Sequence, residues 1–420
     1  MIKTISLLPG ITLRCCRDSR FKQNCLSIQL IRPMSSQEAA LNALIPAILL
    51  RGCQSAPDLR SITLRLDDLY GAAVGPLVRR IGDFQTTGFY CSFIDDRYTL
   101  EADSVLAPMV DFLRQLLLEP LTEKGVFCKE FVKGEKTNLI SAIDSQKNDK
   151  RAYAAAQLLR KMCANDPFGI PRLGESAHVR KITPKSAYAH YQKILKESPI
   201  HLFYVGSAEP EQVAQLLKSV FEQLERDYVS LPEQTPFQGG KTGTFTETMD
   251  VSQGKLCMGF STPVTIRDAD FAAMQMLNTV LGGGMTSKLF MNIREKQSLC
   301  YDIGSAYYGS KGIVTVSAGI DCDKKDFVVG QIMQQLESCR SKDISQEEMD
   351  AAREYLLSGL RSTTDSPGAI ESFFANGAIS GLTMDLQQYA DAVMAVTLND
   401  VAAAAEKLSL QTTFFLKGVQ

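Results

Sequence analysis

Two stretches of sequence decide the fold: Phe89–Asp95, which reads FYCSFID, and Ile313–Asp321, which reads IVTVSAGID. Both are apolar runs of strand length, and both end in Ile-Asp, with the second pair 226 positions after the first. A stretch with apolar residues at helical spacing follows each of them, at Val105–Leu118 and at Phe327–Leu336. The same order of elements in two places predicts an internal duplication.

A second pair of matching residues supports the duplication and helps to set the domain boundaries. Asp144-Ser145 recurs as Asp365-Ser366, at a similar shift of 221 positions. Residues 228–248 contain proline, glycine and threonine without periodicity, which is typical of a linker. We therefore expect two similar domains, at residues 1–227 and 249–420. Strands grouped with several helices, without regular β-α alternation, favour an α+β fold, with a mostly antiparallel sheet and packed helices in each half.

Composition excludes several classes of protein. The 420 residues carry 45 basic and 47 acidic side chains, and the net charge of -2 gives no footprint for nucleic acid. The best apolar run, Ala39–Leu50, is shorter than the roughly 18 residues that span a bilayer, so we expect no membrane segment. No apolar stretch followed by a small-residue cleavage site marks a signal peptide. The eleven cysteines are odd in number and contain no C-x-x-C pair, which indicates a reduced, cytoplasmic protein.

Histidine is scarce in this chain. The three histidines are His178, His190 and His201, and no two are closer than eleven positions. The zinc motifs H-x-x-E-H and H-E-x-x-H, which place two imidazoles on one helix face, are therefore impossible anywhere in the sequence. We expect no metal ion or other cofactor in this chain, and we expect His201 to be a packed or capping residue.

The later half carries the most specific motifs, which are Leu281–Met285 (LGGGM), Ile293–Lys296 (IREK) and Tyr301. At these residues the chain resembles the C-terminal half of the insulinase/pitrilysin-like, or inverzincin, metallopeptidases, which include the mitochondrial processing peptidases. Pro167–Gly169 (PFG) extends the resemblance into the first half. The resemblance implies two similar halves joined by a linker. It also implies a zinc ion held by H-x-x-E-H and by a glutamate from a later helix.

The zinc motif of this family is degenerate here. The residues after the corresponding helix, Leu50–Gly52, place the motif positions at Ala43, Pro46 and Ala47, which offer neither a metal ligand nor a base. Pro46 also predicts a kink, because proline lacks the backbone donor that a helix needs. The glutamate of the later helix survives as Glu135, or Glu135 is an ordinary charge on a helix surface.

The stretch Leu69–Ala72 (LYGA) resembles a bacterial, non-catalytic subgroup of the family, whose members accompany a paralog with intact ligands. Some of that subgroup are named for an association with elongation factor P modification. The resemblance implies a heterodimer in which the catalytic paralog supplies zinc and this chain supplies Arg294 and Tyr301 to a peptide or unfolded protein substrate. A guanidinium offers forked donors to substrate carbonyls, and a phenol can donate to an oxyanion.

Other interpretations of these residues stay open. If the pair has no functional role, Arg294–Lys296 is a solvated helix end and Tyr301 is a core aromatic. Gly282–Gly284 follows a helix and lacks the phosphate-loop pattern, so we expect a helix end with a tight turn. The alternative function is a stand-alone peptide-binding or assembly module without a role in hydrolysis, and a third is an enzyme that uses other metal ligands.

Overall fold

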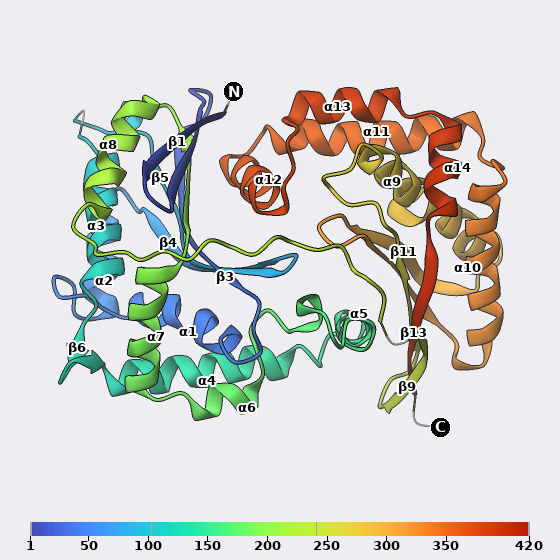
Figure 1. Cartoon of the computed structure of the whole chain (residues 1–420), viewed down its shortest axis with the longest axis horizontal. Helices are drawn as coiled ribbons and strands as arrows, with labels where there is room; N and C mark the ends of the chain where they lie inside the picture. Colours follow the sequence, from blue (N-terminus) through green and yellow to red (C-terminus); the bar gives the residue numbers. More distant parts are fainter. Residues whose placement is uncertain (1, 102, 241, 419–420) are drawn as a thin grey trace. The chain divides into compact units, whose positions relative to one another are not determined.

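The computed structural model describes residues 2–101, 103–240 and 242–418, which form two compact units (Figure 1). The first unit contains Met1–Asp144, Ile170–Glu233 and Thr364–Asn376. The second unit contains Ser145–Gly169, Gln234–Thr363 and Gly377–Gln420. Each unit is built on one main sheet, and each is made of three separate segments of the chain.

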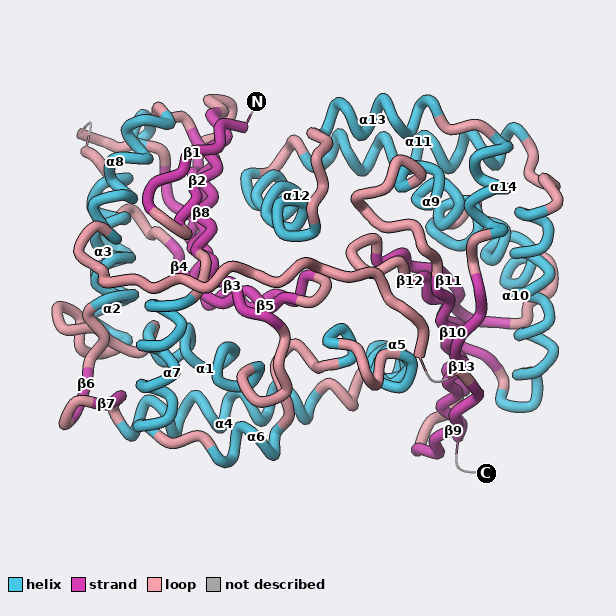
Figure 2. The backbone as a smooth tube through the Cα atoms, viewed as in Figure 1, coloured by secondary structure: helices cyan, strands magenta, loops and turns pink. Residues whose placement is uncertain are grey.

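The first sheet has six strands in the order β1-β2-β8-β3-β5-β4, drawn in magenta in Figure 2. Among these neighbours, β2 and β8 are parallel, and the other pairs are antiparallel. The strands are β1 (Ile2–Leu8), β2 (Ile11–Arg17), β3 (Gln23–Pro33), β4 (Ala73–Ile81), β5 (Phe84–Ile94) and β8 (Ile200–Gly206). A separate short hairpin joins β6 (Thr122–Glu123) and β7 (Val126–Phe127).

The second sheet repeats this pattern with five strands in the order β11-β12-β10-β13-β9. Here β13 and β9 are the parallel pair, and the other neighbours are antiparallel. Each of its strands therefore has a counterpart of matching direction in the first sheet, which confirms the two similar halves and the mostly antiparallel sheets. The strands are β9 (Gly243–Met249), β10 (Gly254–Ser261), β11 (Cys300–Tyr308), β12 (Ile313–Ile320) and β13 (Ser409–Gly418).

Helices pack on these sheets because their apolar residues recur at helical spacing. In α3, for example, Met109, Phe112, Leu113 and Leu116 are buried on one side. They join a core cluster with Leu26 and other residues of alternate positions along β3. The α-helices of the first half, α3 included, are α1 (Ala39–Leu49), α2 (Leu59–Asp68), α3 (Leu106–Leu118), α4 (Lys129–Ser145), α5 (Lys150–Met162), α6 (Ser176–Lys181), α7 (Pro184–Glu197) and α8 (Pro210–Phe221).

The second half contains α-helices and two π-helical turns. The α-helices are α9 (Phe271–Asn278), α10 (Lys325–Arg340), α11 (Gln346–Thr363), α12 (Pro367–Ser380), α13 (Leu386–Ala395) and α14 (Leu398–Glu406). The π-helical turns are η3 (Thr279–Gly283), which continues α9 directly, and η4 (Leu289–Glu295). Instead of ending in a tight turn at Gly282, as expected, the helix therefore continues as a wider turn through Gly283.

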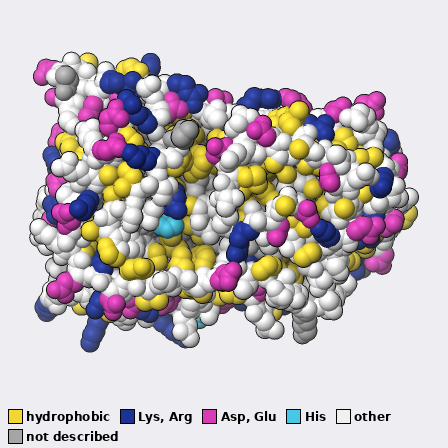
Figure 3. All heavy atoms as spheres, turned by 45° about the horizontal axis from the view of Figure 1, so that its top comes forward, with side chains coloured by type: hydrophobic (Ala, Val, Ile, Leu, Met, Phe, Trp, Pro, Cys, Tyr) yellow, Lys and Arg dark blue, Asp and Glu magenta, His cyan; other side chains and the backbone are white. Residues whose placement is uncertain are grey.

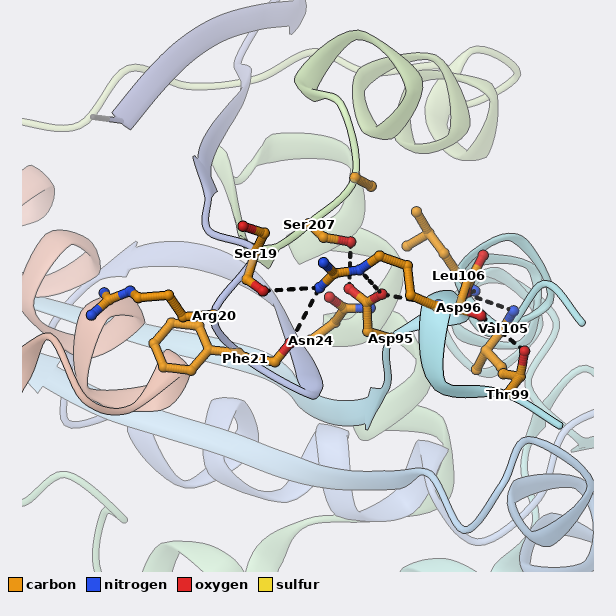
Figure 4. A network of polar contacts seen from close by, with 12 residues as sticks. Ser19, Arg20, Phe21, Asn24, Asp95, Asp96, Thr99, Val105, Leu106 and Ser207 are labelled. Atoms are coloured by element: carbon orange, nitrogen blue, oxygen red, sulfur yellow. Dashed lines mark hydrogen bonds and ion pairs between the residues drawn. The ribbon is translucent and has the colours of Figure 1, made fainter. Parts of the chain in front are cut away.

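The Ile-Asp pair at the end of β5 belongs to a polar network (Figure 4). Asp95 is almost fully buried and accepts hydrogen bonds from the backbone and side chain of Arg97, at 3.1 and 2.8 Å, and from Ser207 Oγ. The neighbouring Asp96 accepts from the backbone amides of Val105 and Leu106 at the start of α3. Asp95 of the pair and the neighbouring Asp96 thus fix the turn between β5 and α3.

The two units exchange a helix at matching points of the repeat. The chain enters the second unit after Asp144, and α5 packs there through Ala154 and Leu158 against the second sheet. It re-enters the first unit at Thr364, so the first ten residues of α12 belong to that unit. The predicted boundaries at 228 and 248 therefore differ from the compact units in these two segments.

A buried carboxylate anchors α12 in the first unit. The Glu371 side chain has no exposed surface and accepts hydrogen bonds from Ser27 Oγ at 2.7 Å and from Gln29 Nε2 at 2.9 Å. Arg79 of β4 binds both of its oxygens, at 3.0 and 2.7 Å. A buried carboxylate needs such partners, because desolvation penalises an unpaired charge.

The end of the predicted linker forms a strand. Residues 243–249 make β9, whose threonines alternate with half-buried residues such as Phe245 and Glu247. Threonine favours strands because its β-branched side chain fits a pleated surface. Only the part before β9 remains a connector without regular structure among the described residues of the predicted linker.

Candidate functional site

The degenerate zinc-motif positions lie on α1, which is a continuous helix despite Pro46. Ala43 and Pro46 are buried and Ala47 is half-buried. A proline within a helix leaves the carbonyl four positions earlier without its usual donor, and that carbonyl belongs to Asn42. Thr87 Oγ1 of β5 donates to it at 2.5 Å. The helix therefore continues past Pro46, where a hydroxyl from the neighbouring sheet replaces the missing backbone donor.

The side chain of Asn42 is the centre of a buried network beneath α1. Its Nδ2 donates to Gln85 Oε1 at 2.9 Å, and its Oδ1 lies 2.7 Å from His190 Nε2. Burial lowers the pKa of His190 to about 4, so its imidazole is neutral near pH 7 and Nε2 carries the proton that Asn42 accepts. Gln85 Nε2 donates in turn to the Ala39 carbonyl at 3.0 Å. This network closes the space under α1.

Glu135 on α4 is held by a neighbour that follows α1. Its Oε1 lies 3.3 Å from Arg51 Nε, and its Oε2 accepts from Asn138 Nδ2 at 3.2 Å. Only 11% of the Glu135 side chain is exposed, so it is not a solvated surface charge. Its carboxylate is already neutralised by a guanidinium.

The residues at this place do not fit a zinc ion. Zinc needs imidazole, thiolate or carboxylate ligands, and the alanines and proline at the motif positions have none of these groups. Throughout the described ranges, no three His, Cys, Asp or Glu side chains are grouped so that they could hold a metal ion. His201 on β8 contacts Arg14, with 3.4 Å between Nδ1 and Nη1, and packs edge-on against Phe203.

Arg294 and Tyr301, by contrast, meet in the second unit. Arg294 lies in η4, and its Nε donates to the backbone carbonyl of Tyr301 at 2.9 Å. Cys300 and Asp302 pair with consecutive residues of β12, so Tyr301 is the extra residue of a β-bulge at the start of β11. The Tyr301 side chain is 75% exposed, which excludes the core-aromatic interpretation.

Two further contacts fix the guanidinium of Arg294. Its carbon lies 4.4 Å from the centre of the Phe290 ring, and its Nη1 donates to Glu295 Oε1 at 3.1 Å. Sequence reasoning missed Phe290 as a site residue. Its position four residues before Arg294 is the signal that could have found it, since residues at that spacing share a helix face.

A groove of about 370 Å³ is lined by Phe290, which stacks on Arg294, and by residues 303–306 of the outer strand β11. Its lining is rich in glycine and small side chains, and it comprises Arg151, Gly282, Gly283, Gly284, Met285, Phe290, Ile303, Gly304, Ser305, Ala306, Thr315 and Ser317. Gly282 is required here, because a Cβ atom at this position would lie 2.8 Å from the backbone nitrogen of Ser305. The glycines therefore leave backbone accessible in part of the groove, and π-helical turns such as η3 are frequent at functional sites.

The charge of the surface is mixed. On the face drawn in Figure 3, Lys and Arg side chains are interspersed with Asp and Glu, in agreement with the net charge of -2. None of the helices in the described ranges is both long and apolar enough to cross a membrane.

Comparison with known proteins shows similarity to a peptidase family. A model described as "Peptidase M16 inactive domain" matches residues 181–356. The chain is 28% identical over 411 residues to a Bacillus subtilis protein named "Probable inactive metalloprotease YmfF", with 98% of this chain and 96% of that protein covered.

Solved structures agree with this match. A conserved protein from Enterococcus faecalis V583 has a TM-score of 0.91 at 26% identity, covering 100% of this chain and 99% of that one. A peptidase M16 inactive domain from Pseudomonas fluorescens shares the fold, with a TM-score of 0.81 at 17% identity over 100% and 98% of the two chains. These matches show that the chain is similar to inactive proteins of the M16 metallopeptidase family, and its own motif positions carry no metal ligand.

Proposed function

We propose that this chain is the substrate-binding or regulatory subunit of a heterodimeric zinc peptidase of the cytoplasm. In this proposal, a catalytic paralog with an intact H-x-x-E-H motif supplies zinc and the base. This chain supplies Tyr301 and Arg294 to the paralog's active site, and the substrate is a peptide or an unfolded protein.

The observation that carries the proposal is the exposure of Tyr301 on a bulge of β11, the strand whose residues 303–306 line the glycine-rich groove. A phenol held away from its own protein can donate a hydrogen bond to the oxygen that becomes negative when a peptide carbonyl is attacked. A groove along an outer strand suits an extended peptide, because main-chain groups can pair there without regard to side-chain sequence. The chain's own motif helix contributes no ligand or base, so the chemical step belongs to the partner.

The test mixes purified catalytic paralog with this chain and follows cleavage of an unfolded peptide. We expect hydrolysis to rise on addition of the chain. With Tyr301→Phe we expect the rate to fall by about 10²-fold, the loss that accompanies removal of one oxyanion donor. Ser219→Ala, at an exposed hydroxyl that donates to Leu216 O in α8, is the matched control and should keep the full rate. If the rate of peptide hydrolysis by the paralog does not change when this chain is added, the proposal is wrong.

The alternative is a stand-alone peptide-binding or assembly module. The groove favours it in one respect, since every residue of its lining belongs to this chain and to one unit. Binding of a labelled unfolded peptide to the chain alone, combined with unchanged hydrolysis by the paralog, would support this module over the peptidase subunit.

A further inference from the structure

The bulge at Tyr301 needs a donor that its own sheet does not provide. An extra residue in one strand interrupts the ladder of hydrogen bonds and leaves its backbone groups unpaired. Arg294 Nε supplies the donor for the Tyr301 carbonyl. The turn before the strand is tight: Ser298 has a φ of 51°, a left-handed value that few residues other than glycine adopt. The bulge is thus an imposed conformation that depends on contacts from η4.

The guanidinium that supplies this donor is itself held in place. Phe290 lies against its flat face, and Glu295 accepts from Nη1. Phe290 is half-buried and also lines the groove. Of the three guanidinium nitrogens of Arg294, Nε and Nη1 have hydrogen-bond partners among the described residues and Nη2 has none. Because Nε is committed to the Tyr301 carbonyl, the side-on fork of Nε and Nη2 cannot clasp a substrate group with two parallel hydrogen bonds.

We propose that Arg294 is a positioning residue rather than a substrate ligand. Its guanidinium, stacked on Phe290, holds the bulge that projects the Tyr301 phenol outward, and Phe290 is the second positioning residue. The importance of the phenol rests on the proposed function, but the brace itself is a property of this chain alone. It predicts that arginine is needed for its flat face and its Nε donor, and that positive charge alone is insufficient.

The first experiment measures the brace without any partner. 3-Fluorotyrosine is incorporated at position 301 of the full-length chain, and its ¹⁹F resonance is recorded. We expect Arg294→Met and Phe290→Leu to shift and broaden the resonance. Arg294→Lys keeps the positive charge, but we expect it to shift and broaden the resonance as Arg294→Met does. The control is Lys296→Met, which removes a neighbouring exposed charge whose amine contacts Asn292, and it should leave the resonance unchanged. An unchanged resonance in Arg294→Met and Phe290→Leu overturns the inference.

A second measurement separates this inference from the proposed function. Circular dichroism first establishes that each variant keeps its fold. If Phe290→Leu does not fold, Arg294→Lys is used in its place. Affinity for a labelled unfolded peptide is then compared with the ¹⁹F result. Loss of affinity in Arg294→Met with an unchanged resonance means direct contact with substrate, which overturns the positioning role while the peptide site stands. A shifted resonance with no effect on hydrolysis by the paralog supports the brace and rejects the subunit role.

Discussion

The motif helix α1 of the first unit and the Arg294–Tyr301 site of the second unit lie in the two halves of the duplication and differ in how their side chains are paired and exposed. Under α1, Asn42, Gln85 and His190 satisfy one another and Thr87 completes the helix at Pro46. At the second site the Tyr301 phenol is exposed. The difference indicates that the helix that carries metal ligands in the metallopeptidases that this chain resembles is a structural joint here. The exposed Tyr301 side chain lies in the other half.

The largest effect should come from the centre of the closed network. Asn42→Leu removes the partners of two buried polar side chains, Gln85 and His190, and we expect it to lower the free energy of unfolding by about 3 kcal/mol. Urea denaturation measures the change. Asn399→Leu, at an exposed position of α14, is the matched control and should stay within about 0.5 kcal/mol. A loss below about 1 kcal/mol for Asn42→Leu would contradict the view of α1 as a satisfied joint.

The pH dependence of stability tests the same joint through His190. Its pKa falls from the usual 6.5 to about 4 because burial disfavours the charged imidazole. Below about pH 6.5 the unfolded chain therefore binds a proton that the folded chain rejects. As the pH is lowered from about 6.5 to about 4, the free energy of unfolding should therefore fall by up to about 1.4 kcal/mol per pH unit because of this group.

Unfolding measured at several pH values in the native chain and in His190→Gln isolates this contribution. The variant should show a shallower slope. It should keep a residual slope from His201, whose pKa burial lowers to about 3. Identical slopes in the two proteins would mean that His190 is not buried in its neutral form.

A double-mutant cycle tests how the helix passes Pro46. Thr87→Val should cost about 1–2 kcal/mol, because the Asn42 carbonyl loses its donor. In a Pro46→Ala background the cost should be smaller, since alanine returns a backbone N–H to that carbonyl. Equal costs of Thr87→Val in both backgrounds would show that the hydroxyl does not replace the proline's missing donor.

The smallest effect on stability should come from the open site. Tyr301→Phe removes a hydroxyl from an exposed side chain, so the unfolding free energy should change by less than about 0.5 kcal/mol. Thermal unfolding measures it. A loss comparable with that of Asn42→Leu would mean that Tyr301 has a structural role, and the contrast between the two regions would disappear.

The sequence predicted the duplication well, because a matching residue pair such as Ile94-Asp95 and Ile320-Asp321 survives at the ends of equivalent strands. It could not predict the exchanged helices, since the buried face of α5 indicates that it packs but not which sheet it covers. The continuation of α1 past Pro46 could not be predicted for a similar reason. The compensating hydroxyl of Thr87 lies 45 positions from the carbonyl that it serves.

At the candidate site, the sequence indicated Arg294 and Tyr301 but not their arrangement. A bulge depends on the register between two strands, and register is set by the partner strand rather than by local pattern. The sequence likewise showed the loss of metal ligands at Ala43 and Ala47. It left the fate of Glu135 open, because the pairing with Arg51 depends on how α1 and α4 pack.

Site-specific crosslinking compares the two regions most directly. A photoreactive benzoylphenylalanine is placed at Tyr301 in one variant and at Ala47 in another, and each full-length chain is irradiated with a labelled unfolded peptide. The account predicts that the peptide is captured at position 301 and not at position 47. Capture at position 47, with none at position 301, would contradict it, because the motif helix would then be the surface that meets the substrate.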